Sequence, residues 1–166
     1  WRVLLMVVVA AFLLSWSSVI VNQIIERDLD KLMKRTCLRP IPTGRVTVYE
    51  ACIFSLLLFI ISITILTVYT NTLTVILSVI SFLLYSFVYT PLKRVGPIAV
   101  FVGAIPGALP PLLGWIASTA EITHEALIIF GIQFIWQFPH FWAIAWVSDD
   151  DYKRAGFKLL PSGGQK

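Results

Sequence analysis

The chain has 166 residues, of which 58% are hydrophobic and only 13% are charged. A soluble domain of this length carries about a quarter charged residues, so the composition predicts a protein that lies mostly in lipid. We therefore interpret the net charge of +4 through its placement along the chain, and expect no nucleic-acid partner. The two cysteines, Cys37 and Cys52, form no metal-binding or redox motif.

Five apolar segments are long enough to cross a bilayer, which takes about 20 residues. In chain order they cover residues 3–21, 46–68, 72–89, 97–117 and 125–147. Several are rich in Val, Ile and Thr, but a segment in lipid must satisfy its backbone hydrogen bonds internally, and this favours helices. We expect an all-α fold, a polytopic transmembrane helical bundle that forms a single domain over residues 1–166.

Basic residues occupy alternate connections between these spans. They follow the first, third and fifth spans: Arg27, Lys31, Lys34, Arg35, Arg39, Arg45, Lys93, Arg94, Lys153, Arg154, Lys158 and Lys166. The connections around Asn71 and at residues 118–124 contain no Lys or Arg. By the positive-inside rule, the basic connections are predicted to face the cytoplasm.

The first span leads into the stretch NQIIERDLDKLMKRTCLRP, which begins at Asn22. If the helix continues, Asn22, Glu26 and Asp30 recur every four residues and share one face, whereas Asp28 falls on the far side. Two carboxylates and an amide near a membrane surface are oxygen ligands that suit Mg²⁺.

Arg35 and Arg39 lie just downstream and can pair with phosphate oxygens bidentately. The same pattern also fits an interfacial helix end whose acids and bases neutralise each other in water, and the spacing alone leaves both interpretations open. Lys93 and Arg94, in the next basic connection, either close the same site or only set the topology.

Polar residues also follow a stripe along the fifth span. Steps of three and four residues connect Gln133, Gln137, His140, Ile144, Val147 and Asp151. Polar side chains within a span tend to face the bundle interior and to be functional. The stripe ends in SDDDY, where the sequence does not separate Asp149, Asp150 and Asp151 as metal ligands. Two acidic clusters at one bundle mouth can hold a diphosphate between metal ions, although a transporter's ion site would look similar.

These motifs resemble those of the UbiA-type intramembrane prenyltransferases. NQIIERDLDKLMKRTCLRP is similar to the first acidic motif of that family, and YTPLKR, GAIPGALPPLLGW, WQFPHFWAIAW and DYKRAGFKLLP follow in the family's order. MKRTCLRP, GAIPGALPPLLGW and WQFPHF resemble the branch that farnesylates haem. The resemblance implies a nine-helix bundle, of which this chain would lack the first helix and the last three.

The resemblance implies that the farnesyl group of farnesyl diphosphate is joined to a vinyl carbon of haem B, which gives haem O. Mg²⁺ would help the diphosphate to leave, and an allylic carbocation would develop. It further implies a bacterial inner membrane with both acidic motifs on the cytoplasmic side, and haem A synthase or cytochrome oxidase assembly proteins as partners. An aromatic prenyltransferase of quinone synthesis and a membrane transporter with an acidic ion site are the alternatives.

The resemblance also assigns roles to the site residues. The predicted catalytic residues are Asn22, Glu26, Asp30 and Asp151, and the predicted Mg²⁺ ligands are Glu26, Asp28, Asp30 and Asp151. The predicted substrate-binding residues are Arg35, Arg39, Lys93, Arg94, Gln137, His140 and Tyr152. Imidazole is a common axial haem ligand, but for His140 we favour a role in pocket polarity together with Gln137.

Two departures from the family pattern bear on the acceptor. Relatives that prenylate phenols often carry a second Asp where this chain has Ala155. Many relatives also have Asp where this chain has Glu26, and a second acid where it has Gln23. Both changes are compatible with the haem-farnesylating branch, and they weaken the case for a quinone-type substrate.

Overall fold

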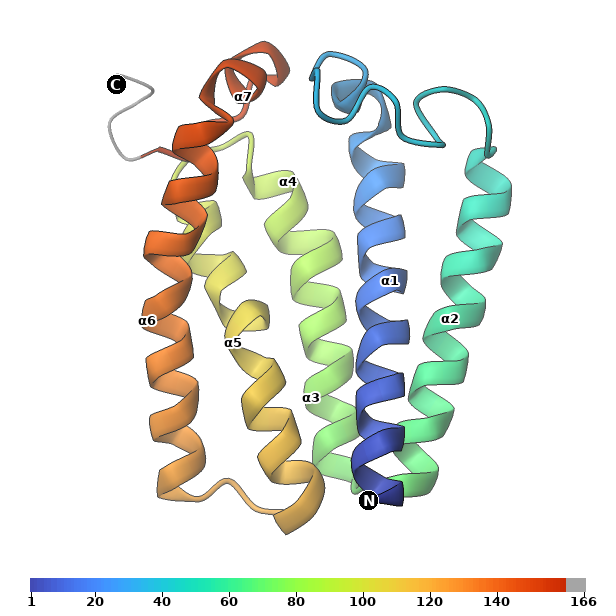
Figure 1. The fold of residues 1–166 in the computed structure, drawn as a ribbon, viewed down its shortest axis with the longest axis vertical. Coiled ribbons are helices and arrows are strands. Elements are labelled where there is room, and N and C mark those ends of the chain that lie inside the picture. Colours follow the sequence, from blue (N-terminus) through green and yellow to red (C-terminus); the bar gives the residue numbers. More distant parts are fainter. Residues whose placement is uncertain (161–166) are drawn as a thin grey trace.

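The computed structural model describes residues 1–160, and every regular element within them is helical (Figure 1). The elements are α1 (Arg2–Asp30), α2 (Val48–Tyr69), α3 (Thr72–Leu83), the π-helical turn η1 (Leu84–Tyr89), α4 (Thr90–Leu92), α5 (Ile98–Thr119), α6 (His124–Val147) and α7 (Asp149–Ala155). Five helices, with α3, η1 and α4 forming one of them, are long and apolar enough to cross a membrane. The predicted all-α bundle with five spans is therefore confirmed. Lys166, predicted to belong to the basic tail, lies outside the described residues.

The first span continues through the acidic stretch and ends only at Asp30. The chain then forms the α1–α2 loop (residues 31–47) before α2 begins at a capping box. In this box the Glu50 N–H donates to Thr47 Oγ1 at 3.2 Å, and the Thr47 N–H donates to the Glu50 carboxylate at 2.8 Å. The extension of α1 places Asn22, Glu26 and Asp30 on one helix.

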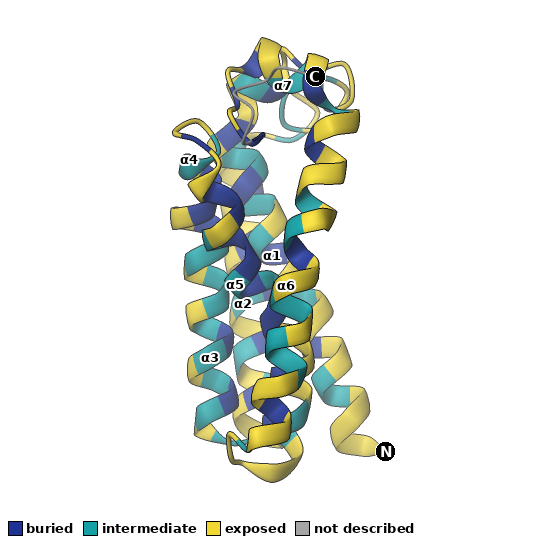
Figure 2. Cartoon of the chain, turned by 90° about the vertical axis from the view of Figure 1, so that its left-hand side faces the viewer, coloured by how far each residue is buried: buried dark blue, intermediate teal, exposed yellow. Residues whose placement is uncertain are grey.

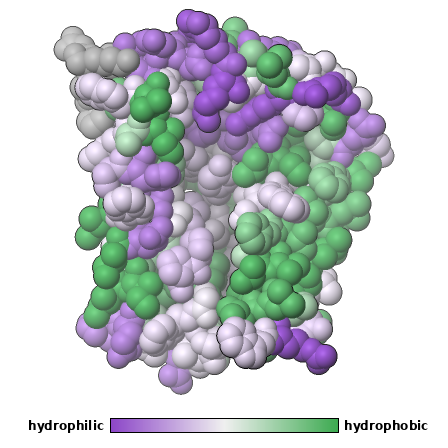
Figure 3. Space-filling view, in the orientation of Figure 1, coloured by the Kyte–Doolittle hydropathy of each residue, from purple (hydrophilic) through white to green (hydrophobic). Residues whose placement is uncertain are grey.

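The basic connections all lie at one end of the bundle, at the top of Figure 1. This end carries the α1–α2 loop, the turn after α4, and the α7 segment, by which we mean residues 149–160. The N-terminus, the α2–α3 turn and the α5–α6 turn lie at the opposite end. Hydrophilic residues gather at the α7 end, and hydrophobic residues cover α1 and α2 below it (Figure 3). Which end faces the cytoplasm stays a prediction.

Helix α1 is attached to α2 by serine side chains. Ser17 Oγ donates to the carbonyl of Ser55 at 2.9 Å, and Ser55 Oγ donates back to the carbonyl of Ser17 at 3.0 Å. One level further from the acidic motif, Ser62 Oγ donates to the carbonyl of Ala10 at 2.7 Å. Small residues let helices approach closely in lipid, where side-chain hydrogen bonds also join them. The helix that carries the acidic motif is therefore held to α2 by hydrogen bonds as well as by packing.

Helix α5 is joined to α6 through a carbonyl that proline leaves free. Pro111 has no N–H, so the carbonyl of Gly107, four residues earlier, lacks its usual helical donor. Gln137 Nε2 of α6 donates to this carbonyl at 3.1 Å. Apart from this strip α6 is largely exposed (Figure 2), and its buried residues are Ala126, Gln137 and Ala145.

Candidate functional site

A polar pocket of about 190 Å³ lies at the α7 end of the bundle. Its walls come from α1, the α1–α2 loop, η1, the turn after α4, α6 and the α7 segment. The residues that line this polar pocket are Asn22, Glu26, Asp30, Met33, Arg35, Thr36, Arg39, Tyr85, Tyr89, Lys93, Phe141, Ile144, Tyr152, Phe157 and Leu159. The structure thus brings seven of the predicted site residues together: Asn22, Glu26, Asp30, Arg35, Arg39, Lys93 and Tyr152.

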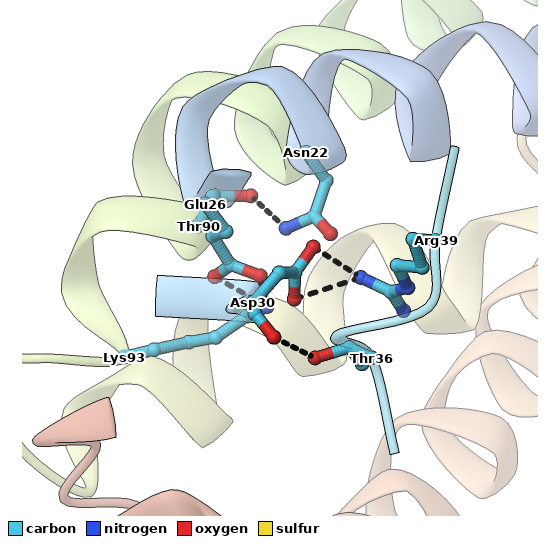
Figure 4. Close-up of polar contacts among 7 residues, drawn as sticks. All are labelled: Asn22, Glu26, Asp30, Thr36, Arg39, Thr90 and Lys93. Carbon is cyan, nitrogen blue, oxygen red and sulfur yellow. Dashed lines mark hydrogen bonds and ion pairs between the residues drawn. The ribbon is translucent and has the colours of Figure 1, made fainter. Parts of the chain in front are cut away.

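Glu26 is paired with Lys93 across the pocket (Figure 4). Lys93 Nζ lies 2.8 Å from Glu26 Oε1 and donates a hydrogen bond to Oε2 at 3.0 Å. The side chains of Glu26 and Lys93 are only 5% and 12% exposed, so this ion pair is largely shielded from water. Burial lowers the pKa of Lys93, and the negative charge of Glu26 opposes that effect. Lys93 Nζ also lies 5.0 Å from the centre of the Tyr89 ring.

Asp30 is fully buried and is held by Arg39 and Thr36. The guanidinium nitrogen Nη1 of Arg39 donates to both carboxylate oxygens of Asp30, at 3.1 and 2.8 Å. Thr36 Oγ1 donates to the backbone carbonyl of Asp30 at 3.0 Å. Because an unpaired buried charge is costly, Arg39 stabilises the structure at the base of the loop by pairing with the Asp30 carboxylate.

Asn22 is positioned through the π-helical turn. Its Nδ2 donates to Thr90 Oγ1 at 3.0 Å, and Thr90 Oγ1 donates to the carbonyl of Tyr85 at 2.9 Å. The amide oxygen of Asn22 is then the atom available to a ligand. A π-helical turn interrupts the regular helix and is often found at functional sites. Here it places Tyr85 and Tyr89, whose ring centres lie 5.4 Å apart, in the wall of the polar pocket.

The second acidic cluster does not line the polar pocket. Both carboxylate oxygens of Asp151 accept backbone hydrogen bonds from the α1–α2 loop, from Lys34 N–H at 3.1 Å and from Arg35 N–H at 3.0 Å. The Arg35 N–H is the main cause of the lowered pKa of Asp151, against an opposing effect of burial. Asp149 is buried and pairs with Lys153 at 2.8 Å beside a different cavity, and Asp150 is exposed.

Four further predicted residues also lie away from the polar pocket. Asp28 is 72% exposed and pairs with Lys31 at 3.1 Å on the outer face of α1. Arg94 and His140 are exposed. Gln137 is buried but bonds to the Gly107 carbonyl, so its contact is structural rather than with the pocket. The predicted stripe on α6 is therefore divided, because Gln137 contacts α5, His140 lies on the outer surface and Ile144 lines the polar pocket.

Sequence reasoning missed several pocket residues that carry no charge. Tyr85 and Tyr89 come from the π-helical turn, and Phe157 comes from the segment after α7. The motif YTPLKR, which starts at Tyr89, gave the only local signal for this turn. Burial raises the pKa of Tyr152, which was predicted and does line the pocket.

An apolar cavity of about 250 Å³ adjoins the polar pocket deeper in the bundle, and Tyr85 and Phe141 line both. This apolar cavity is lined by Leu14, Ser15, Ser18, Val19, Ser81, Phe82, Tyr85, Gly103, Pro106, Gly107, Pro110 and Phe141. Leu14 lies eight residues before Asn22 on α1, which is about 12 Å at the rise of an α-helix. A charged compartment thus lies next to an apolar one, with Tyr85 and Phe141 in the walls of both.

The oxygen atoms of the pocket fit Mg²⁺ in chemical type. Glu26 Oε1 is buried and accepts no hydrogen bond, although Lys93 Nζ is near it, and Asn22 and Asp30 supply further oxygens from the same helix face. Within residues 1–160 no three His, Cys, Asp or Glu residues lie close enough to hold a metal ion by themselves. An Mg²⁺ ion at this site would therefore complete its coordination with water and substrate oxygens.

Fold and pocket together define a multi-pass integral membrane protein with a buried, charged chamber at one end of its bundle. The UbiA prenyltransferase family matches residues 1–163, and the chain belongs to this family. No solved structure matches the chain significantly.

Several curated relatives are named protoheme IX farnesyltransferase. A protoheme IX farnesyltransferase of Cytophaga hutchinsonii is 56% identical over 162 residues, which are 98% of this chain and 57% of the relative. The protein of that name from Flavobacterium psychrophilum is 50% identical over 97% of this chain and 53% of its own length. The mitochondrial protoheme IX farnesyltransferase of Arabidopsis thaliana is 42% identical over 86% of this chain and 34% of its own length. The chain thus spans about half the length of the bacterial relatives it matches.

Proposed function

We propose that this chain is the part of a haem-farnesylating enzyme that binds farnesyl diphosphate. The observation that carries the proposal is the polar pocket, with its three basic and two acidic side chains, joined to an apolar cavity through Tyr85 and Phe141. An allylic diphosphate has the same division, with a charged head and an apolar tail. The relatives' name supports farnesyl transfer to protohaem, with haem B as the acceptor and haem O as the product.

The charges of the polar pocket suit the diphosphate. Arg35, Arg39 and Lys93 carry three positive charges and Glu26 and Asp30 two negative ones, which leaves an excess of one positive charge (3 − 2 = 1). A prenyl diphosphate carries more negative charge than this, and a divalent cation would neutralise the remainder. Charges fixed in a shielded site stabilise a departing anion more strongly than the same charges in water.

We infer that Mg²⁺ is the cation and that Asn22, Glu26 and Asp30 would hold it. When bound, it would supply the positive charge that lets the diphosphate depart. Arg39 and Lys93 currently neutralise the two carboxylates, and both cations lie close enough to contact the diphosphate when it enters the polar pocket. Asp28 and Asp151 are not part of this proposed ligand set because their side chains lie outside the pocket.

The apolar cavity would hold the farnesyl tail. The small side chains of Ser15 and Ser18 leave space between α1 and α5, and Gly103 and Gly107 also line this cavity. The rings of Tyr85, Tyr89 and Phe141 stand where the two compartments meet, and aromatic faces attract a cation such as an allylic carbocation. In the complete protein, exclusion of water from the pocket would protect reactive intermediates from hydrolysis.

We infer a bacterial inner membrane with the polar pocket on the cytoplasmic side. The charge of the connections and bacterial relatives such as that of Cytophaga hutchinsonii support this inference. Haem A synthase and cytochrome oxidase assembly proteins stay predictions from the sequence.

The test is to incubate membranes that contain the complete protein with farnesyl diphosphate, Mg²⁺ and haem B, and to identify the pigments by mass. Haem O is expected from the wild type, and Glu26→Gln and Asp30→Asn should reduce its formation at least a hundredfold. Asp28→Asn is the matched control on the same helix, and it should retain activity. The proposal fails if haem O is absent, if only an aromatic acceptor is prenylated, or if the Glu26 and Asp28 variants behave alike.

A further inference from the structure

The turn that follows α1 leaves two neighbouring backbone N–H groups without a backbone partner. The N–H groups of the surrounding residues Leu32, Met33, Thr36 and Cys37 donate to nearby backbone carbonyls. Lys34 and Arg35 make no such bond, and their N–H groups donate instead to Asp151, which is more than a hundred residues away in the sequence. Asp151 thus satisfies the two donors that the local turn does not.

Both oxygens of Asp151 take part in this contact. Oδ1 accepts the N–H of Lys34 at 3.1 Å and Oδ2 accepts the N–H of Arg35 at 3.0 Å. Asp151 also forms an ion pair with Arg154 on the same helix, whose Nη1 lies 3.6 Å from Oδ1. A carboxylate that accepts two backbone N–H groups is held in one orientation, and this orientation points at the loop rather than into the polar pocket.

Other contacts bring the same two segments together. Met33 of the loop packs with Ala155 and Phe157 of the α7 segment in a buried apolar cluster. The N–H of Lys158 donates to the carbonyl of Lys93 at 2.9 Å, which attaches the far end of the α7 segment to the turn after α4. The α7 segment therefore touches the two connections that carry the pocket's basic residues.

We propose that Asp151 is a positioning residue, which fixes the backbone at Lys34 and Arg35 so that the Arg35 side chain faces the diphosphate. This inference rests on the proposed function of the polar pocket. It explains why Tyr152, the next residue, lines the pocket while Asp151 does not. This contact holds the α1–α2 loop and the α7 segment, two walls of the pocket that are distant in the sequence, in a fixed relative position.

The two roles of Asp151 differ in the absence of metal. A positioning residue protects the Lys34 and Arg35 amides whether or not Mg²⁺ is present, whereas a ligand would affect the loop only when metal and diphosphate are bound. Asp151→Asn keeps the size of the side chain but turns one acceptor into a donor that faces a backbone N–H. Asp150→Asn is the matched control, because Asp150 is the exposed neighbour and carries the same charge.

The experiment is residue-resolved hydrogen exchange of the complete protein in lipid with EDTA. In the wild type, the Lys34 and Arg35 amides should exchange at least tenfold more slowly than the amide of Leu38, whose N–H donates no hydrogen bond in the structure. Asp151→Asn should remove about a tenfold protection at both amides, and Asp150→Asn should not. With Mg²⁺ restored, Asp151→Asn should raise KM for farnesyl diphosphate severalfold and leave the Mg²⁺ concentration for half-maximal activity unchanged.

Unprotected Lys34 and Arg35 amides in the wild type without metal would overturn the proposal, and this result does not depend on any variant folding. So would an Asp151→Asn protein with normal loop protection and a raised Mg²⁺ requirement, which would identify Asp151 as a metal ligand. Failure of the proposed function is distinguishable, because an inactive wild-type protein would still show whether the two amides are protected.

Discussion

Replacing Gly107 with Ala is expected to break the hydrogen bond that joins α5 to α6. An added Cβ would lie 2.7 Å from both Cδ and Oε1 of Gln137, which is closer than side-chain atoms tolerate. Gln137 can turn away because these atoms are at the end of a flexible side chain, but its Nε2 then no longer reaches the carbonyl at position 107. Pro111 cannot supply a donor to that carbonyl, so it would remain unsatisfied in the interior of the membrane-spanning part.

The size of the effect follows from this loss. Side-chain hydrogen bonds between membrane helices contribute about 0.6–1.7 kcal/mol, and a buried acceptor left without a donor costs about 1–3 kcal/mol. We therefore expect Gly107→Ala to lower the free energy of unfolding by about 1–3 kcal/mol, measured by SDS titration in mixed micelles. Gly114→Ala is the matched control on α5, because no atom lies within 4 Å of its added Cβ. It should be neutral or slightly stabilising, since Ala favours helix over Gly.

A second substitution tests the cause. Pro111→Ala restores a backbone N–H that can donate to the carbonyl of residue 107 within α5. In the Gly107→Ala background it should therefore recover a large part of the lost stability. Equal unfolding free energies for the Gly107 and Gly114 variants would refute the reasoning, and so would a Pro111→Ala substitution that only adds a further loss.

Three further predictions concern the charged end of the bundle. Lys93→Met should destabilise the protein by about 3–5 kcal/mol because it leaves Glu26 buried without its counterion, and Glu26→Gln in the same chain should reverse most of this loss in the same SDS titration. Since the folded pKa of Asp151 is lowered, its contribution to loop protection should be complete above its ordinary pKa of about 4 and be lost as the pH falls through the folded value. The difference in hydrogen exchange between wild type and Asp151→Asn should therefore be constant down to about pH 4 and become smaller at lower pH, and a difference that grows below pH 4 would contradict the reasoning. Single cysteines at Thr43 and Thr119, in a background without Cys37 and Cys52, should react with impermeant reagents from opposite faces of the membrane, and labelling from one face would contradict the crossing pattern.

The first acidic motif was predictable because its spacing is local. Asn22, Glu26 and Asp30 recur at the helical period, and the structure extends α1 to Asp30, so the three side chains share a face and line one pocket. The same period assigned Asp28 to the opposite side, where it is exposed, although the family resemblance had suggested it as a ligand. The five spans were predictable for a similar reason, since the length of an apolar run is a local property.

The stripe on α6 was predicted less well, because periodicity does not show how much of a helix surface a neighbouring helix covers. Gln137 and His140 are three residues apart, and on a helix this separates their directions by about 60°. Within the described residues α6 packs mainly against α5, which buries Gln137 and leaves His140 exposed. A role for His140 as a haem ligand or in pocket polarity stays a prediction without support from the polar pocket's geometry.

The orientation of Asp151 depends on contacts between distant parts of the chain. Nothing near it in the sequence indicates that its carboxylate reaches the backbone of residues 34 and 35. The partners of Glu26 and Asn22 are similarly remote, because Lys93 and Thr90 follow them by 67 and 68 residues. Charge placement predicted that these groups lie at one end of the bundle, but only the packing of η1 and α4 against α1 determines the pairs.

The ion pairs on α1 can form only in a certain order while the protein is being synthesised. Asp30 meets its cation within nine residues, at Arg39, so it can be neutralised as soon as the α1–α2 loop leaves the ribosome. Glu26 has no such neighbour and must wait until two more helices have entered the membrane and the chain has reached Lys93. Until then α1 would hold an unpaired carboxylate near the membrane surface, kept in place by the serine bonds to α2. The walls of the pocket would thus form in steps during insertion, and the wall that contains Tyr152 and Phe157 would form last.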